Sequence, residues 1–290
     1  MDVLHNAPDL VATARQAVIY AHEQLFRLLY HAPSTISTQA FTIARRPIED
    51  LYAIADMYGC TALVATHMGK HLQCFKNDID LLRSCIDDIP SILDFSMKTR
   101  SAWIFRKAMV RLIGCPQKLD PATREACDKL GLKDLIEAKE AEFRLLLQHT
   151  EHQLFTTFGY GPLNEAENRP VAGLVRDFFR EWFASKIRKG QGSGMRPGYA
   201  KVYRRLESVD IPARLKTEAF MKQHISCRVS TLTFEQALKE AFKNTAPVIA
   251  TIMTAGASEL YLYYYVNPKE SPLTCINIID DDLPWKGKPW

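Results

Sequence analysis

The sequence predicts an all-α protein, a multi-helix orthogonal bundle with a small β-hairpin near its C-terminus. Apolar residues recur at the helical spacing i, i+3, i+4 and i+7 along most of the 290 residues. Glycine and proline divide these stretches into separate helices. The spacing changes near the C-terminus, where Tyr261–Val266 and Leu273–Ile278 are rich in strand-forming residues and are separated by Asn267, Pro268 and Ser271. Hydrophobic residues make up 47% of the chain, which is enough for a packed core.

The stretch 47–75 predicts a pair of short antiparallel helices around which the rest of the chain is organised. Pro47 suits the first position of a helix, because its missing amide hydrogen would have no partner there. Gly59 permits the left-handed turn that ends this helix. Thr61 can cap the second helix. The predicted buried residues are Ile48, Leu51, Tyr52, Ala55 and Tyr58 in the first helix, and Val64, Met68, Leu72 and Phe75 in the second.

Further helices are predicted on both sides of this pair. Before it, Ala7–Tyr30 forms one long helix, and His31–Arg46 is a connection. The packed side of the long helix is predicted to carry Val11, Ala14, Val18, Ala21, Leu25 and Leu28. After the pair we expect a helix over Asp78–Ile86, one that follows Pro90 and ends at Gly114, one opened by Asp120 and Pro121 and interrupted at Gly131, and one over Leu132–Phe158.

The polar segment 159–170 divides the prediction into two lobes, residues 1–158 and residues 171–290, packed as one unit. The second lobe begins with a helix over Val171–Ile187, which carries an aromatic stripe of Phe178, Phe179, Trp182 and Phe183. Two further helices are expected over 199–209 and 213–224. A last helix is opened by the capping-box pair Thr233 and Gln236 and is kinked at Pro247.

Composition and charge disfavour several classes of protein. The chain has 37 Lys and Arg against 33 Asp and Glu, and its net charge of +4 is small for a dedicated nucleic-acid binder. The seven cysteines are scattered, without a C-x-x-C pair, which favours reduced thiols over a disulfide framework or a zinc site. Neither a secretory signal nor an apolar run long enough to cross a membrane is visible. We therefore expect an intracellular protein, cytoplasmic or nuclear.

One segment of the central pair resembles a known family. The residues LYAIADMYGCTAL, Leu51–Leu63, are similar to the last helix pair of a BTB/POZ domain, in which a helix is followed by "ADKYGC"-like residues and a second helix. Ser101–Gly114 (SAWIFRKAMVRLIG) and Leu273–Trp285 (LTCINIIDDDLPW) are similar to segments downstream of the BTB domain in a large group of filamentous-fungal proteins. Together with the central helix pair, these segments extend the resemblance over most of the chain from about Pro47 to Trp285. The resemblance implies a role in protein contacts.

The resemblance covers the helical part of a BTB domain only. Such a domain begins with strands and helices that build a small sheet and a dimerisation surface. The residues before Pro47 show no match to that part. The resemblance therefore does not extend to the family's dimerisation surface or to its binding of cullin-type ligases.

The sequence contains no catalytic or phosphate-binding motif of the forms G-x-S-x-G, G-x-x-x-x-G-K-[ST] or G-x-G-x-x-G. His67 and His71 have the spacing at which two imidazoles share a metal, but H-E-x-x-H is missing. We predict no metal and no cofactor. His149 and His152 are expected at the surface near a helix C-terminus.

A basic run and the aromatic stripe remain as candidate contact sites. Lys186, Arg188, Lys189, Arg196, Lys201, Arg204 and Arg205 follow one another without an acidic residue between them. They can hold a carboxylate, a phosphate or an acidic partner, although a solvated edge is the simpler interpretation. The stripe is more often core than pocket, and Asp280–Asp282 is expected to be a solvated end. The residues predicted to contact a ligand or a partner are Trp103, Phe179, Trp182, Lys186, Arg188, Tyr203, Arg204 and Tyr263.

Two functional hypotheses fit these observations. The first is a helical protein-interaction or scaffold module without a cofactor. The second is a cofactor-independent biosynthetic cyclase that folds an apolar terpenoid or polyketide in an interior pocket, since ring closure requires orientation and a hydrogen-bond donor rather than a nucleophile. The partner is accordingly another protein or an apolar small molecule. A closed apolar pocket favours the cyclase, and an exposed apolar face favours the interaction module.

Overall fold

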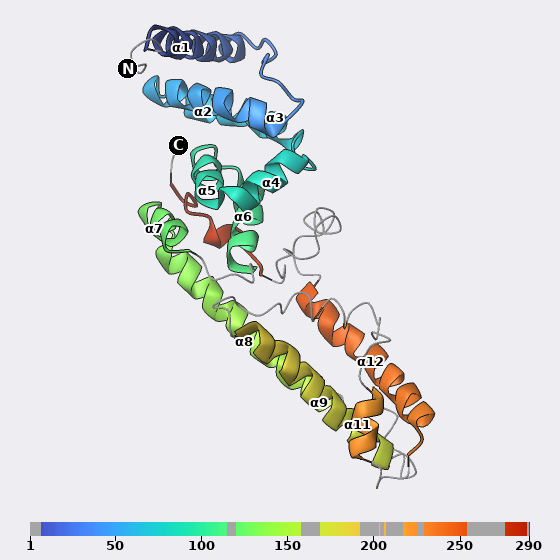
Figure 1. The fold of residues 1–290 in the computed structure, drawn as a ribbon. Helices are drawn as coiled ribbons and strands as arrows, with labels where there is room; N and C mark the ends of the chain where they lie inside the picture. The colour runs from blue at the N-terminus through green and yellow to red at the C-terminus, as the bar shows by residue number, and fades with distance from the viewer. Residues whose placement is uncertain are drawn as a thin grey trace, which may run out of the picture. The chain divides into compact units, whose positions relative to one another are not determined.

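The computed structural model describes residues 7–114, 120–157, 169–191, 203, 206, 217–224, 229–253, 276–288 and 290. Every regular element in these residues is helical, which confirms the all-α prediction for this part of the chain (Figure 1). The predicted hairpin lies mostly outside the described residues. Its last three residues, 276–278, are described, and they have no strand structure.

The chain divides into two compact units. Unit 1 comprises Met1–Met109 together with Ile278–Trp290, and unit 2 comprises Val110–Asn277. This division differs from the predicted lobes of residues 1–158 and 171–290 in two ways, because residues 110–158 belong to unit 2 and residues 278–290 belong to unit 1. There Trp285 meets the ring of Phe105 edge-on, with 5.4 Å between ring centroids, and Arg106 donates to the carbonyl of Ile278 at 2.9 Å.

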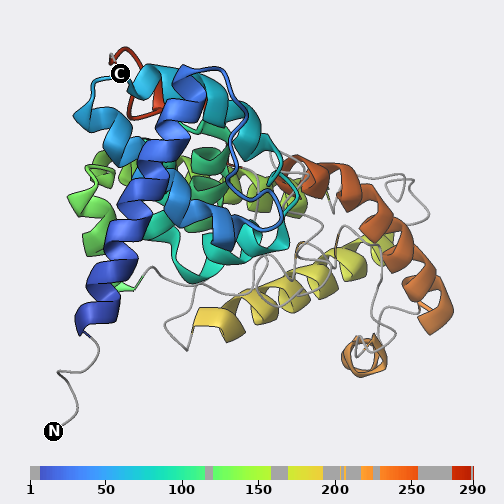
Figure 2. The ribbon, with the colours of Figure 1, turned by 90° about the horizontal axis from the view of Figure 1, so that it is seen from above.

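Unit 1 contains six helices among its described residues, the last of which crosses the division at Met109. They are α1 (Ala7–Leu29), α2 (Phe41–Met57), α3 (Thr61–Gln73), α4 (Ile79–Asp87), α5 (Ile89–Lys98) and α6 (Ala102–Gly114). α1 packs on α2 and α3, and α2 also contacts α4 and α5. Figure 2 shows α1 lying across the other helices of this unit. The centre of the core is Phe41, whose ring meets Phe75 and Phe95 edge-on at 5.9 and 5.3 Å.

The start of α2 corrects the prediction. α2 begins at Phe41 rather than at Pro47, so the predicted connection over His31–Arg46 ends at residue 40. The carboxylate of Asp78 accepts the Phe41 amide hydrogen at 2.7 Å and so caps α2 from a distant part of the chain. Pro47 is tolerated inside the helix because the carbonyl that it leaves unbonded belongs to Ile43, an exposed residue where solvent can supply the bond.

The turn between α2 and α3 agrees with the prediction at Gly59 and differs beside it. Gly59 has a φ of +66°, the left-handed conformation that the sequence predicted. Thr61 is the first residue of α3 rather than its cap, and Cys60 occupies the N-cap without a side-chain hydrogen bond. Tyr58, predicted to be buried, is exposed because it follows the last turn of α2, beyond the packed face.

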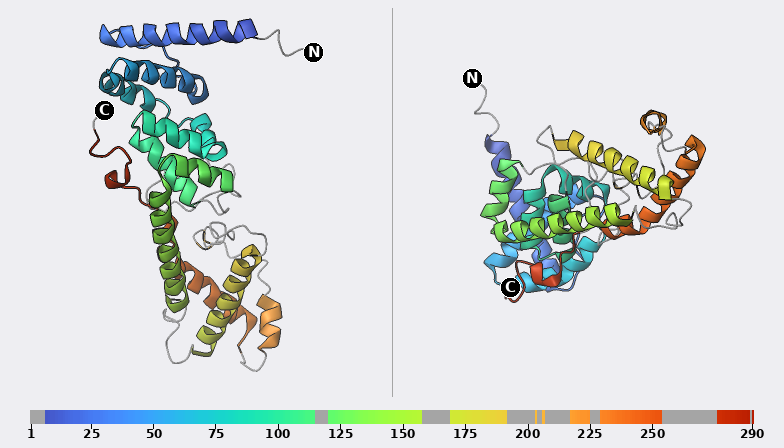
Figure 3. Two further views of the ribbon diagram at one scale, coloured as in Figure 1. Left: turned by 90° about the vertical axis from the view of Figure 1, so that its left-hand side faces the viewer. Right: turned by 90° about the horizontal axis from the view of Figure 1, so that it is seen from below.

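Unit 2 contains α7 (Pro121–Lys129), α8 (Lys133–Thr157), α9 (Arg169–Gln191), α11 (Thr217–Gln223) and α12 (Thr231–Met253) among its described residues. α12 packs on α8, α9 and α11, and Figure 3 shows it crossing α9. Asp120 caps α7 through the Thr123 amide at 2.9 Å, as predicted. α12 begins at Thr231, two residues before the predicted Thr233 cap, because the hydroxyl of Ser230 accepts the Thr233 amide hydrogen at 3.1 Å.

The side chains of Asp280 and Asp281 are exposed to solvent, as predicted, and the acidic run Asp280–Asp282 is also folded. It forms the short 3-10 turn η4. Asp280 pairs with Arg106, Asp281 pairs with Lys286, and the carboxylate of Asp282 accepts the Ile279 amide hydrogen at 2.8 Å. Each carboxylate therefore has a partner within unit 1.

Candidate functional site

α1 carries apolar side chains on an inner side and on an adjoining outer side. Its inner side packs against α2 and α3 through Ala21, Leu25 and Leu28, all buried. Its other side carries five large apolar side chains whose exposed fractions range from 44% for Leu29 to 81% for Tyr30. We call these five residues the outer face of α1: Val18, Ile19, Phe26, Leu29 and Tyr30.

The five residues of the outer face share one side of the helix, with His22 between the pair Val18 and Ile19 and the group Phe26, Leu29 and Tyr30. At about 100° per residue along a helix, its five residues fall within one arc of about 120°. A helix that is apolar on both sides is ordinarily buried on both. The spacing of apolar residues predicted the inner residues and placed Ala14 and Val18 with them, but Ala14 and Val18 are exposed. The missed signal is the pair of large residues Phe26 and Tyr30, four apart on the side opposite Ala21.

The outer face continues onto the end of α2. The Nδ1–H of His22 donates to the carbonyl of Val18 at 2.9 Å, which leaves Nε2 to accept from the Tyr58 hydroxyl at 3.3 Å. The two rings meet edge-on with 5.8 Å between centroids. Tyr58 and its neighbour Met57 are themselves exposed. The apolar surface is therefore larger than one helix and is fixed by a side-chain contact between α1 and α2.

A second candidate site in unit 1 is a cavity of about 570 Å³ beside α2. One wall is the exposed side of α2, and the opposite wall is the end of α5 together with Arg100 and Trp290. The guanidinium of Arg100 lies 4.2 Å from the Trp290 ring centroid and also donates to the carbonyl of Lys288 at 2.9 Å. The complete lining is Arg46, Glu49, Asp50, Tyr52, Ala53, Asp56, Thr61, Met97, Lys98, Arg100 and Trp290.

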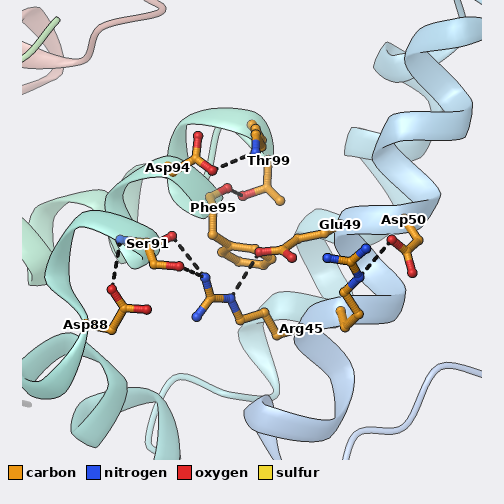
Figure 4. A network of polar contacts seen from close by, with 10 residues as sticks. Arg45, Glu49, Asp50, Asp88, Ser91, Asp94, Phe95 and Thr99 are labelled. Carbon is orange, nitrogen blue, oxygen red and sulfur yellow. Dashed lines mark hydrogen bonds and ion pairs between the residues drawn. The ribbon is translucent and has the colours of Figure 1, made fainter. Parts of the chain in front are cut away.

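Ion pairs lie along the walls of this cavity, and Figure 4 shows those made by Asp50 and Asp94. Arg46 pairs with Asp50 at 3.0 Å, and Lys98 pairs with Asp94 at 2.6 Å. The hydroxyl of Tyr52 donates to the carbonyl of Thr99 at 3.4 Å, and burial raises the pKa of this tyrosine. Six of the eleven lining residues are charged, and the cavity is open to solvent on one side, unlike the closed apolar chamber that a cyclase of apolar substrates needs.

Behind the cavity, Arg45 joins α2 to α5. Its guanidinium pairs with Glu49 at 3.1 Å, donates to the carbonyl of Ser91 at 3.2 Å and also contacts the Ser91 hydroxyl. The same group lies 5.9 Å from the ring centroid of Phe95 (Figure 4). This arrangement fixes the two helices that form the walls.

Three of the predicted contact residues lie together in the core of unit 2. The rings of Phe179 and Trp182 are 6.1 Å apart, and Phe183 links Phe179 to Tyr203 with centroid distances of 5.5 and 6.1 Å. Phe179 and Tyr203 are fully buried, and Trp182 is partly buried. Their surroundings are other aromatic rings, which is the arrangement of a packed core.

One titratable group enters this aromatic core. The Tyr203 hydroxyl donates to the carboxylate of Glu151 at 3.5 Å. Burial raises the pKa of Glu151, and the hydrogen bond from Tyr203 opposes that shift. The pair therefore places a half-buried acid at the edge of the cluster.

The other predicted contact residues are not gathered at this cluster in the described structure. Trp103 lies on α6 in unit 1, partly buried, with the ammonium of Lys107 5.2 Å from its ring centroid. Lys186 and Arg188 lie on α9, and their side chains are outside the described part. Arg204 and Tyr263 also lie outside the described residues, as does most of the basic run.

Among the described residues, no three His, Cys, Asp or Glu side chains are grouped closely enough to hold a metal ion. His71 instead packs edge-on against Phe75 at 5.9 Å. Burial lowers the pKa of His71, partly offset by a hydrogen bond with the backbone of Ser37. No described helix combines the length and the apolar composition needed to cross a bilayer.

Comparison of the chain with protein-family models, with curated proteins and with solved structures finds no match. The resemblance to BTB/POZ proteins therefore stays a prediction.

Proposed function

We propose that this protein is a helical interaction module that binds another protein chain through the outer face of α1. The observation that carries the proposal is the second apolar side of α1, with Phe26 and Tyr30 open to solvent while Leu25 and Leu28 are buried. A contiguous exposed apolar stripe marks an interaction site in a folded protein. Binding at such a face needs no cofactor.

Two further points support this function over the cyclase. The segment Leu51–Leu63 that resembles a BTB/POZ helix pair includes Tyr58, which meets His22 beside the outer face. The cavity next to α2 supports ring closure less well, because charged side chains form much of its lining. The proposal therefore places function on a surface and not in a pocket.

The test is site-specific photo-crosslinking in cells of the source organism. A photoreactive phenylalanine analogue is placed at Phe26 or Ile19, in the outer face, or at Gln16, which is exposed on a different side of α1. Residues 19 and 26 should give the same discrete crosslinked chains, and residue 16 should not. Replacing Leu29 with Glu should abolish those products.

Equal crosslinking from residues 16, 19 and 26 would overturn the proposal, since it would show that the outer face has no preferred partner. Circular dichroism of each variant serves as the folding control. No loss of helix is expected, because all of these side chains are exposed in the folded chain.

A further inference from the structure

We propose that the cavity beside α2 binds a small zwitterion, an α-amino acid with an apolar side chain, whose ammonium group lies at Asp56 and whose carboxylate lies at Arg100. The inference concerns a second site and does not depend on the outer face of α1. It follows from the charges on the two walls of the cavity, from two residues that are locally unfavourable there, and from the aromatic surface between them.

The two walls of the cavity carry opposite charge. The charged residues of the wall opposite α2 are both bases, Lys98 and Arg100. The α2 wall contributes one base and three acids, which are Arg46, Glu49, Asp50 and Asp56. One of the walls would repel a ligand that has a single charge. A zwitterion can face each wall with the group that the wall attracts.

Asp56 is the acid of the α2 wall that remains for a ligand. Glu49 pairs with Arg45 at 3.1 Å. Asp50 pairs with Arg46 at 3.0 Å. The carboxylate of Asp56 makes no hydrogen bond or ion pair with any residue that the structure describes. It also lies in the last turn of α2, where the helix dipole repels a negative charge, and a bound ammonium group would remove that repulsion.

Arg100 is the locally unfavourable residue of the opposite wall. Its φ of +48° lies in the left-handed region, which a residue with a side chain adopts at an energetic cost. It follows Thr99, the C-cap of α5, at the position where glycine is the usual residue. The contacts of its guanidinium with the Trp290 ring and the Lys288 carbonyl keep this group at the cavity wall. The planar fork of N–H groups in a guanidinium matches the two oxygens of a carboxylate.

The space between the walls suits an amino acid with an apolar side chain. The cavity volume of about 570 Å³ is in the range of small-molecule sites. The apolar lining consists of the half-exposed indole of Trp290, the Tyr52 ring 6.3 Å from it, Ala53 and Met97. A ligand ring can pack against the indole while its two charged groups reach the walls. Because one side of the cavity is open to solvent, we expect a weak Kd of about 0.1–1 mM.

The first experiment compares three probes that share a phenyl ring and differ in their charged groups. Phenylalanine has both charges, phenethylamine lacks the carboxylate, and 3-phenylpropanoate lacks the ammonium group. NMR titration of the full chain gives each Kd, and the indole N–H resonance of Trp290 is assigned by its loss in Trp290→Phe. Phenylalanine should shift this resonance and bind at least about tenfold more tightly than either analogue, because each analogue loses a charged hydrogen-bonding group.

The second experiment assigns each charge to a wall. Asp56→Asn should weaken binding of phenylalanine and phenethylamine about tenfold without weakening 3-phenylpropanoate. Arg100→Gly should weaken phenylalanine and 3-phenylpropanoate without weakening phenethylamine, and glycine is chosen because it adopts the left-handed conformation without strain. Lys98→Gln, which changes an exposed side chain of the same wall, should act like Arg100→Gly with a smaller effect. Asp87→Asn is the matched control, since it removes an exposed acid at the end of α4, outside the cavity lining, and it should bind all three probes like the unmodified protein.

Three outcomes overturn the site: no shift of the Trp290 resonance with phenylalanine up to about 10 mM, equal affinity for the three probes, or undiminished phenylalanine binding by Asp56→Asn. The amide spectrum of each variant is the folding control. If Arg100→Gly alters that spectrum beyond the cavity, Lys98→Gln decides whether this wall binds the carboxylate. Photo-crosslinking through the outer face tests the proposed function separately, so either proposal can fail while the other stands.

Discussion

The two units differ in the contacts that supplement their apolar cores. In unit 1, polar side chains join segments that are far apart in sequence: buried Gln24 accepts the Thr35 amide hydrogen at 2.9 Å, Asp78 caps α2, and Arg45 joins α2 to α5. In unit 2, edge-on aromatic pairs join the helices, with Phe179 and Phe178 each touching several other rings. Both units have apolar cores, and in unit 1 polar side chains additionally fix helices to segments elsewhere in the sequence.

The same contrast separates α1 from α9, two helices of 23 residues each. The stripe of α9 is covered, since Phe178 meets Phe220 and Phe234 at 5.1 and 5.6 Å. The outer stripe of α1 is exposed. Similar apolar patterns therefore produce a core in one unit and an open surface in the other, and the difference lies in which helices pack against them.

The largest loss of stability is expected in the buried aromatic stripe of α9. Phe179→Ala should lower the free energy of unfolding by about 3–5 kcal/mol, because it removes a fully buried ring and leaves a cavity. Phe26→Ala should change it by less than about 0.5 kcal/mol, because this ring is half exposed. Urea denaturation followed by circular dichroism measures both. Equal losses would show that the outer face is covered within the monomer.

Sequence periodicity predicted the helices well and their partners poorly. The buried stripes of α3 and α6 and the turns at Gly59 and Gly131 follow from local spacing and from glycine's access to positive φ. The start of α2 does not, because its cap comes from Asp78, which is distant in sequence. The outer face was missed for the same reason: a helical pattern says which residues share a side and not what packs on it.

The next largest loss of stability is expected where a polar side chain of unit 1 connects two helices. Asp78 accepts hydrogen bonds from two amides, that of Phe41 at 2.7 Å and that of Asp80 at 2.7 Å, and so caps α2 and α4 together. Asp78→Ala should cost about 2 kcal/mol of unfolding free energy. Asp78→Asn keeps one acceptor oxygen and should therefore lose only about half as much unfolding free energy as Asp78→Ala. Thermal unfolding of the three proteins compares them, and a loss no larger than for a single cap would refute the double role.

A smaller effect separates two adjacent arginines on α2. Arg45 and Arg46 each pair with an acid four residues later, but Arg45 is mostly buried and also contacts Ser91, whereas Arg46 is largely exposed. Arg45→Met should lower the unfolding free energy by about 1 kcal/mol. Arg46→Met should lower it by less than about 0.5 kcal/mol. Similar urea midpoints for the two variants would mean that Arg45 does not fix α2 to α5.

The smallest effect is a pH dependence in unit 2, at the cap of α7. Hydrogen bonds from the Thr123 hydroxyl and amide hold the pKa of Asp120 below its ordinary value. Because this pKa is lower in the folded chain than in the unfolded chain, the carboxylate stabilises the fold above about pH 4, and the contribution is lost as the pH falls through the folded pKa. Asp120→Asn, which keeps a capping oxygen without the charge, should be slightly less stable than the unmodified protein at pH 7 and equal to it near pH 2. Urea midpoints at both pH values measure the difference. A gap that persists at the lower pH would mean that the shape of the side chain, and not its charge, supports α7.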